Sequence, residues 1–218
     1  MAEDNVTNSI HIVLCVDQTP SMQYQIKTDK KNTSKNTIEI MTAVNEGVAA
    51  FVKVFEEKKV STVFSSITFD NECKISEPID ISGGGTECEP KYKAKPTGKA
   101  CIAGALSQAA ARLKGCGNKD NMYVVFVSDG IVEPGEDAEE LAKAIDKLKD
   151  YHCYTVGFSA AHGETTLRTL LDYYTNKQIT TWTDKDKYIE RFKKIAAIIT
   201  DEKEQKPKDS GSGSNTEY

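Results

Sequence analysis

Residues 11–22 read HIVLCVDQTPSM, an apolar run that ends at an aspartate and continues into a turn that contains hydroxyl side chains. A strand that is apolar at almost every position is buried on both faces, which is typical of the central strands of parallel sheets. Residues 122–130, MYVVFVSDG, repeat this arrangement, because a second apolar run ends there at Asp129. The two stretches predict buried strands whose carboxyl ends each carry an acidic side chain.

The rest of the chain alternates between two apolar spacings. Between 37 and 57 apolar residues recur every three or four positions, which indicates a long helix, whereas 60–69 is strand-like. Asp70 and Asn71 favour a turn into CKISEPI at 73–79, so these two strands are expected to form an antiparallel hairpin at the sheet edge. Further helices are expected at 100–114, 138–149, 163–174 and 185–199, and further strands at 151–158 and 178–183.

This alternation predicts an α/β fold: a doubly wound, mostly parallel central sheet with one antiparallel edge strand and helices on both faces. One domain is expected over residues 9–200, because a chain of 218 residues can bury most of its apolar surface in a single unit. Residues 201–218 have almost no apolar side chain and are expected to be a disordered polar tail. Polar stretches at 23–36 and 82–99 predict long surface loops.

Composition argues against several classes of partner. The 28 basic and 33 acidic residues give a net charge of −5, which is the wrong sign for a nucleic-acid-binding surface. The first ten residues lack the features of a secretory signal, and no apolar run is long enough to span a membrane. Cys15 and Cys153 lie in apolar strands, where free cysteine packs as a small hydrophobe. A cytoplasmic protein without a membrane or nucleic-acid partner is expected.

The turn after the first strand carries the candidate chemistry. Asp17, Thr19 and Ser21 place three oxygens on one side of a tight turn, and Asp129 brings a second carboxylate from another strand end. Oxygen ligands of this kind suit a hard divalent cation, Mg²⁺ first, with Mn²⁺ or Ca²⁺ as alternatives. With only two charged ligands the ion stays electron-poor, so it would attract a further carboxylate from outside.

These residues resemble the von Willebrand factor A (vWA) family, in which D-x-[S/T]-x-S, a distant threonine and a distant aspartate form a metal-ion-dependent adhesion site. Asp17, Thr19 and Ser21 match the first element, and Asp129 matches the last. The resemblance extends over nearly the whole predicted domain and implies the Rossmann-like vWA fold. It further implies a non-enzymatic protein-binding module, whose metal ion captures an Asp or Glu of a partner protein.

The distant threonine of the family pattern has two candidates here. Thr97 lies shortly before the helix expected at 100–114 and is the first choice, while Thr86 follows three glycines, as it does in many relatives. The commonest spacing of the family instead falls on Ala100, which has no oxygen to offer. An incomplete site therefore stays open as an alternative.

Two other functions remain beside the binding module. A Mg²⁺-dependent phosphatase of the haloacid-dehalogenase class also places an Asp after its first strand, but its D-x-D motif needs a second Asp as general acid, and Thr19 occupies that position. The other alternative is a vWA scaffold that binds no metal. Within the family, this small chain resembles cytoplasmic bacterial members, which often act in stress-response, tellurium-resistance-type or chaperone-like assemblies beside ATPases or kinases. The sequence does not decide the oligomeric state.

Overall fold

A mixed β-sheet forms the centre of the computed structural model, which describes residues 9–27, 37–81, 91–95, 97–129, 137–157 and 185–205. Its strands are β1 (Ile10–Asp17), β4 (Thr62–Phe69), β5 (Cys73–Ile75), β6 (Ile79–Asp80), β7 (Met122–Ser128) and β8 (His152–Gly157). They are arranged in the order β5-β4-β1-β7-β8, and β6 also pairs with β4. β1, β4, β7 and β8 run parallel, whereas β5 and β6 run antiparallel to β4.

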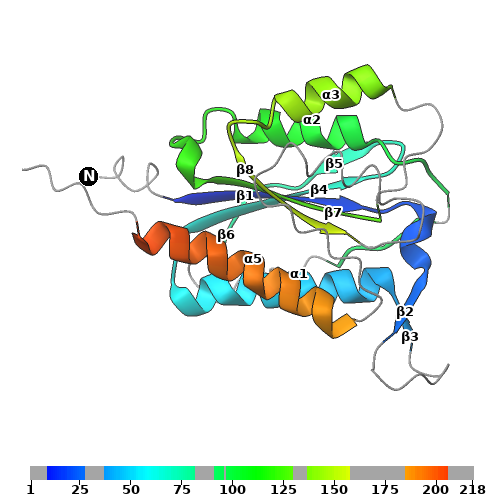
Figure 1. The fold of residues 1–218 in the computed structure, drawn as a ribbon, viewed down its shortest axis with the longest axis horizontal. Helices are drawn as coiled ribbons and strands as arrows, with labels where there is room; N and C mark the ends of the chain where they lie inside the picture. The colour runs from blue at the N-terminus through cyan, green and yellow to red at the C-terminus, as the bar shows by residue number, and fades with distance from the viewer. Residues whose placement is uncertain are drawn as a thin grey trace, which may run out of the picture.

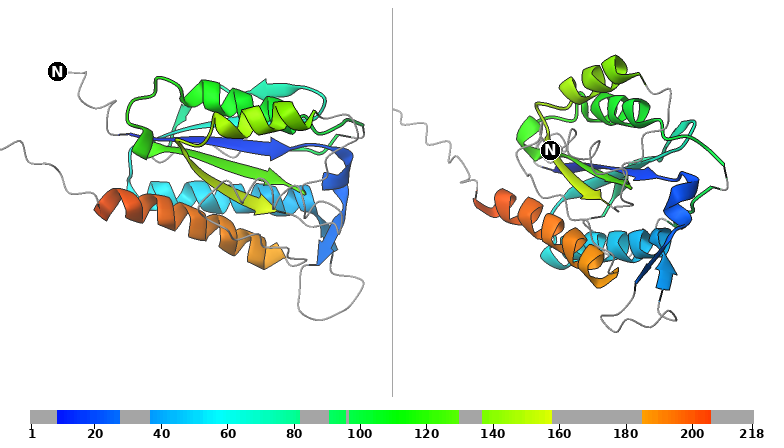
Figure 2. Two further views of the ribbon diagram at one scale, coloured as in Figure 1. Left: turned by 45° about the horizontal axis from the view of Figure 1, so that its top comes forward. Right: turned by 45° about the vertical axis from the view of Figure 1, so that its right-hand side comes forward.

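Helices cover both faces of this sheet. One face carries α1 (Ile40–Lys58) and α5 (Lys185–Gln205), and the other carries α2 (Ile102–Leu113) and α3 (Ala138–Asp146), as Figure 1 and both views of Figure 2 show. The expected doubly wound α/β fold, with a mostly parallel sheet and an antiparallel edge, is therefore confirmed.

The central strand β1 explains why its sequence is apolar throughout. Ile12 and Leu14 point into the core beneath α1 and α5, while Val13 and Cys15 point into the second core beneath α2 and α3. All eight residues of β1 are buried, as a strand with a helical layer on each face must be. The prediction that Cys15 and Cys153 are buried free thiols is confirmed.

The chain reverses its winding direction between β1 and β7. From β1 it crosses by way of α1 to β4 on one side, and from there it returns by way of α2 to β7 on the other side of β1. The carboxyl ends of β1 and β7 are therefore the topological switch point, where ligands bind in open sheets of this class. Asp17 is the last residue of β1, and Asp129 directly follows β7.

The polar stretch after β1 contains more regular structure than its composition predicts. A 3-10 helix, η1 (Pro20–Gln23), begins directly after Thr19, and β2 (Gln25–Lys27) pairs antiparallel with β3 (Thr37–Glu39). The expected helix at 37–57 consequently begins at Ile40, because residues 37–39 form β3. Strands of three residues give too short a pattern to recognise from sequence.

The last helix is longer than expected. α5 continues to Gln205, so residues 201–205 are helical although they belong to the segment expected to be a disordered tail. These residues read DEKEQ, and Glu, Lys and Gln favour a helix even without an apolar face to pack. The expected helix at 163–174, the expected strand at 178–183 and residues 206–218 lie outside the described residues.

Candidate functional site

The first loop of the site folds back on the Asp17 carboxylate. Asp17 Oδ1 accepts hydrogen bonds from the backbone N–H of Thr19 at 2.8 Å and from Thr19 Oγ1 at 2.6 Å. Thr19 Oγ1 lies 3.1 Å from Ser21 Oγ. An aspartate that accepts from the backbone two residues later forms a tight Asx turn, which is why this short polar sequence holds one conformation. The three oxygen-bearing residues predicted to act together are thus connected in one hydrogen-bonded row.

The end of β7 supplies the second half of the site. Ser128 is fully buried, and its Oγ donates a 2.6 Å hydrogen bond to the other carboxylate oxygen of Asp17, Oδ2. The pairing of Val16 with Val127 places the two strand ends side by side, which makes this contact possible. Asp129 follows and is 1% exposed, so a second carboxylate is buried at the same edge of the sheet.

The pKa of Asp17 reflects its burial beside hydroxyl groups and a second carboxylate. Burial raises the pKa of Asp17 to about 6, while the hydrogen bonds from Ser128 and Thr19 act in the opposite direction, and the nearby Asp129 carboxylate raises it further. Without a cation, two carboxylates held out of water therefore oppose each other's ionisation.

A third segment, residues 91–95, crosses the first loop. The backbone of Tyr92 exchanges two hydrogen bonds with the side chain of Asn45 on α1, at 2.7 and 2.9 Å. Lys95 N–H then donates to the Gln18 carbonyl at 2.8 Å, and the Gln23 side chain donates to the Lys95 carbonyl at 2.9 Å. This segment is thereby fixed one residue away from Asp17, where a ligand from a third loop is expected.

Of the two threonine candidates for that ligand, the structure describes Thr97 but not Thr86. Thr97 lies two residues beyond Lys95, at the start of the bend that leads to α2, and its side chain is exposed. In the part of the chain that the structure describes, no hydrogen bond joins Thr97 to Asp17 or Asp129. Thr86 lies outside the described residues. The identity of the third-loop ligand stays a prediction.

A third buried carboxylate, Asp70, follows β4 and pairs with Lys95. The Lys95 ammonium hydrogen-bonds the Asp70 carboxylate, whose Oδ1 also accepts from Glu72 N–H at 3.0 Å. Burial alone would raise the pKa of Asp70, yet these hydrogen bonds and the positive charge of Lys95 hold it below its ordinary value. Gly98 has φ of +146°, and a side chain there would approach Asp70 Cβ to 3.1 Å. Lys95 and Asp70 therefore tie the third loop to the edge of the sheet.

The sequence does not predict two residues of this site. Ser128 is expected from sequence only as the last residue of a strand. Its position directly before Asp129, at the end of an apolar run, is the signal that could have identified it. Asp70 is expected from sequence only as a turn former. Its burial depends on Lys95, which is distant in sequence, so nothing local to Asp70 could indicate it.

The donor chemistry fits a hard divalent cation. The two carboxylates, of Asp17 and Asp129, and the hydroxyls of Thr19 and Ser21 offer oxygen alone, which is the preference of Mg²⁺. Burial, and to a smaller extent the Asp129 charge, raises the pKa of Asp17, and a cation between the carboxylates would offset both effects. Among the described residues there is no cluster of three or more His, Cys, Asp or Glu side chains placed to hold a metal, so hydroxyl ligands are essential to this fit.

No family model and no curated protein matches this sequence. Solved structures do match. A von Willebrand factor type A protein from Catenulispora acidiphila aligns with a TM-score of 0.68 at 15% identity, over 88% of this chain and 42% of that one. The pilus adhesin SpaC from Lactobacillus rhamnosus GG aligns with a TM-score of 0.65 at 15% identity, over 88% of this chain and 30% of that one.

A third match differs in length from these two. The conserved hypothetical protein BatB from Bacteroides thetaiotaomicron aligns with a TM-score of 0.56 at 12% identity, over 90% of this chain and 100% of that one. This chain thus spans less than half of the first two structures and the whole length of the third. Identities this low show the fold alone, and on that level the chain has the α/β fold of a vWA domain.

Proposed function

We propose that this chain is a protein-binding module in which a Mg²⁺-class ion, held by Asp17, Thr19, Ser21 and Asp129, captures a carboxylate of a partner protein. The observation that carries the proposal is the burial of two carboxylates from adjacent strand ends at the topological switch point, with hydroxyl groups hydrogen-bonded beside them. Two like charges held out of water call for a counter-ion, and oxygen ligands favour a hard one.

The same donor set explains why the partner would contribute an acid. An ion with two charged ligands and neutral hydroxyls keeps positive charge, and a coordination position open to solvent would prefer an Asp or Glu over a neutral donor. The vWA-fold neighbours support a protein-interaction role for a domain of this architecture. At the position where a haloacid-dehalogenase-class phosphatase needs its acid, the Thr19 hydroxyl donates a hydrogen bond to Asp17, which favours binding over catalysis.

We further place the module inside the cell, in a stress-response assembly beside an ATPase or kinase. The described cysteines are free thiols, which is compatible with a reducing compartment; they are Cys15, Cys73, Cys101, Cys116 and Cys153. No helix in the described ranges has the length and apolar character to cross a membrane.

Thermal unfolding in the presence of Mg²⁺ tests the ion directly. A ligand that binds only the folded state adds about 2.7 kcal/mol at a free concentration of 100 times its Kd, so Mg²⁺ or Mn²⁺ should raise the melting temperature by several degrees. Asp17→Ala should abolish the rise. Asp146→Ala, which removes an exposed acid from α3, is the matched control and should keep it. An equal rise in the Asp17 variant would overturn the proposed site.

The third-loop ligand needs a separate pair of variants. Because Thr97 is the first choice from sequence, Thr97→Ala is expected to weaken Mg²⁺-dependent stabilisation more than Thr86→Ala does. The opposite order would assign the ligand to the glycine-rich segment. If neither variant changes the effect of Mg²⁺, the ion has no threonine ligand from this loop and the site has only the four ligands named above.

A further inference from the structure

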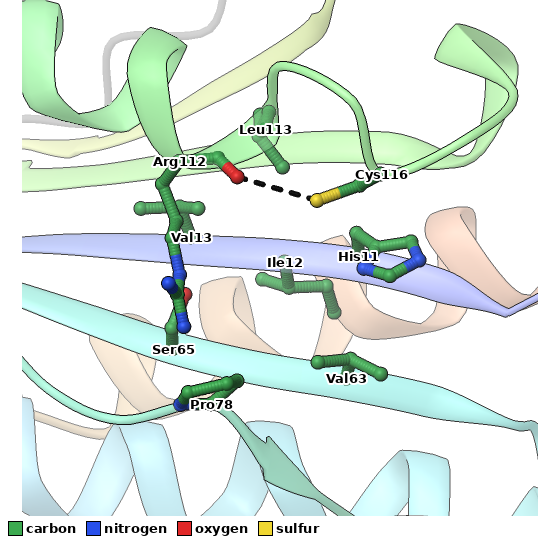
Figure 3. A pocket seen from close by; sticks show the side chains of 9 residues that line it. All are labelled: His11, Ile12, Val13, Val63, Ser65, Pro78, Arg112, Leu113 and Cys116. Atoms are coloured by element: carbon green, nitrogen blue, oxygen red, sulfur yellow. Dashed lines mark hydrogen bonds between the residues drawn. The ribbon is translucent and has the colours of Figure 1, made fainter. Parts of the chain in front are cut away.

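A cavity of about 260 Å³ lies at the opposite end of the sheet from Asp17. Figure 3 shows the side chains that line it, which come from the first half of β1, from β4, from the residue before β6 and from the end of α2. Most of the lining is apolar, including Val13, Val63 and Leu113. The size is just below the usual range of about 300–1,000 Å³ for small-molecule sites, so a small ligand is the class that fits.

The Arg112 guanidinium lines this mostly apolar cavity. In Figure 3 the Arg112 side chain extends from α2 across the cavity toward Ser65 of β4, while Cys116 and His11 lie at the other end. Arg112 is half-buried, and within the described ranges its guanidinium makes no hydrogen bond or ion pair. The Ser65 hydroxyl, on a residue that is 4% exposed, likewise has no hydrogen-bond partner there. Because these hydrogen-bond donors are partly shielded from water, an acceptor on a bound ligand would stabilise them.

The chemistry of these two donors selects the ligand. A guanidinium presents two parallel N–H groups that match the two oxygens of a carboxylate. A phosphate would bring a second negative charge into a mostly apolar cavity that has one arginine to balance it, and the uncompensated charge would be costly. The apolar walls beside Arg112 suit a short hydrocarbon chain.

From this cavity we infer a second binding site, independent of the proposed metal site, for a small monocarboxylic acid with a short apolar chain. The carboxylate pairs with Arg112 and Ser65, and the chain lies along Val13, Val63 and Leu113 toward Cys116.

Hexanoate is the probe, and titration calorimetry of the full chain is the measurement. Hexanoate should bind saturably with a Kd on the order of 1 mM or tighter. Hexanamide, which keeps the chain but not the charge, and acetate, which keeps the charge but not the chain, should each bind about tenfold more weakly or worse. Saturable binding of hexanamide as tight as that of hexanoate would overturn the carboxylate assignment, and no binding of hexanoate would overturn the site.

Variants locate the binding. Arg112→Gln should weaken hexanoate binding by about tenfold or more, and Arg112→Lys should recover part of the loss because a point charge remains without the planar pair of donors. Lys114→Gln is the matched control, since it removes an exposed positive charge from the same end of α2 and should change the Kd by less than about twofold. An Arg112→Gln protein that folds and binds hexanoate as tightly as the wild type contradicts the proposal.

Cys116 provides a readout that needs no variant. Its half-buried thiol lines the cavity, whereas Cys101 is a half-buried thiol outside it. Burial raises the pKa of Cys116, so alkylation is best followed at mildly alkaline pH, with each cysteine quantified by mass spectrometry of its peptide. Saturating hexanoate should slow alkylation of Cys116 and leave Cys101 unchanged. Equal effects on both thiols, or none on Cys116, would overturn the site even if Arg112→Gln failed to fold.

Discussion

In the metal-free protein, opposing effects act on the charge of the Asp17 carboxylate. Burial and the Asp129 carboxylate disfavour its charge, and the hydrogen bonds from Thr19 and Ser128 favour it, with a net rise in pKa to about 6. An amide in place of this carboxylate would still accept from Thr19 and could donate to the Ser128 hydroxyl. We therefore expect Asp17→Asn to raise the free energy of unfolding of metal-free protein at pH 7, by about 1–3 kcal/mol. Urea unfolding in EDTA measures this change.

The comparison needs an exposed acid as its control. Asp146→Asn on α3 removes the same charge at a solvent-facing position and should change stability by less than about 0.5 kcal/mol. If Asp17→Asn is less stable than the wild type in EDTA, the charged form is compensated in the fold, and the argument for a counter-ion at this position fails.

Asp70 has the opposite sign of pH dependence. Its pKa is held below the ordinary value, chiefly by Lys95, so its charge stabilises the fold above the unfolded pKa of about 4, and this contribution is lost as the pH falls through the folded pKa. Lys95→Met leaves the buried carboxylate without that partner and should cost about 1–3 kcal/mol at pH 7. Unfolding in urea at pH 7 and at pH 3 should show the difference shrinking at the lower pH.

A neighbouring lysine provides the control that distinguishes the Lys95–Asp70 pair from the general loss of a positive charge. Lys93 is exposed on the same segment, and Lys93→Met should leave the free energy of unfolding nearly unchanged at both pH values. A loss at pH 7 that persists undiminished at pH 3 would show that Lys95 acts through the packing of its hydrocarbon chain and not through Asp70.

At the scale of elements, the contact between α1 and α5 depends on the absence of a side chain at Gly47. A Cβ built there would come within 2.2 Å of the Phe192 ring, which is fully buried. Alanine favours a helix over glycine by about 1 kcal/mol, yet the overlap with a rigid ring in the core costs about 1–3 kcal/mol or more. Gly47→Ala should therefore lower the melting temperature and not raise it.

The second half of that test is a double variant. Phe192→Leu removes the ring that the new methyl group would meet, so Gly47→Ala should cost less in the Phe192→Leu background than in the wild type. Additive effects of the two substitutions would mean that the methyl group is accommodated elsewhere, and that this close approach does not set the distance between the helices.

The elements that can be predicted well from sequence are those with strong apolar periodicity. β1 and β7 are buried on both faces, and α1 has a single apolar face, so each leaves a signal that extends over several residues. The ribbon of β2 and β3 has no such signal, because its strands have three residues each. The C-terminal end of α5 is not predicted for a different reason. Residues 201–205 continue the helix because their side chains favour it, but they lack the apolar periodicity from which a helix is predicted.

The candidate site divides in the same way. Asp17, Thr19 and Ser21 are close in sequence, so their row of hydrogen bonds follows from local spacing. The position of Asp129 follows from topology, because parallel strands bring their carboxyl ends to one edge. The third loop cannot be placed by either rule. Its anchors are the Lys95–Gln18 backbone contact and the pairing of Tyr92 with Asn45, both between segments far apart in the chain.

For the whole molecule, α5 up to Thr200 contributes to the core, and we expect that the fold does not need residues 206–218. Ile199 is fully buried in the core beneath α1 and α5, and the buried Thr200 hydroxyl hydrogen-bonds the Ala196 and Ala197 carbonyls of the preceding turn. Residues 206–218 contain one aromatic residue, at the very end, and otherwise polar or small side chains, so they offer no apolar anchor. The two segments should therefore respond differently to deletion.

Deletion of residues 206–218 should leave the melting temperature within about 1 °C of the full chain, because surface changes away from the core cost at most about 0.5 kcal/mol. Deletion of 199–218 removes a core isoleucine, whose loss costs about 2–5 kcal/mol, together with the contact of Lys58 with Asp201. That shorter chain should melt many degrees lower. The Mg²⁺-induced rise should persist in the first truncation, since the proposed ligands lie at the carboxyl ends of β1 and β7, at the opposite end of the sheet from the C-terminal end of α5 (Figure 1). A drop in stability on removing 206–218 alone would show that these residues pack on the domain, and the domain boundary would then lie beyond Gln205.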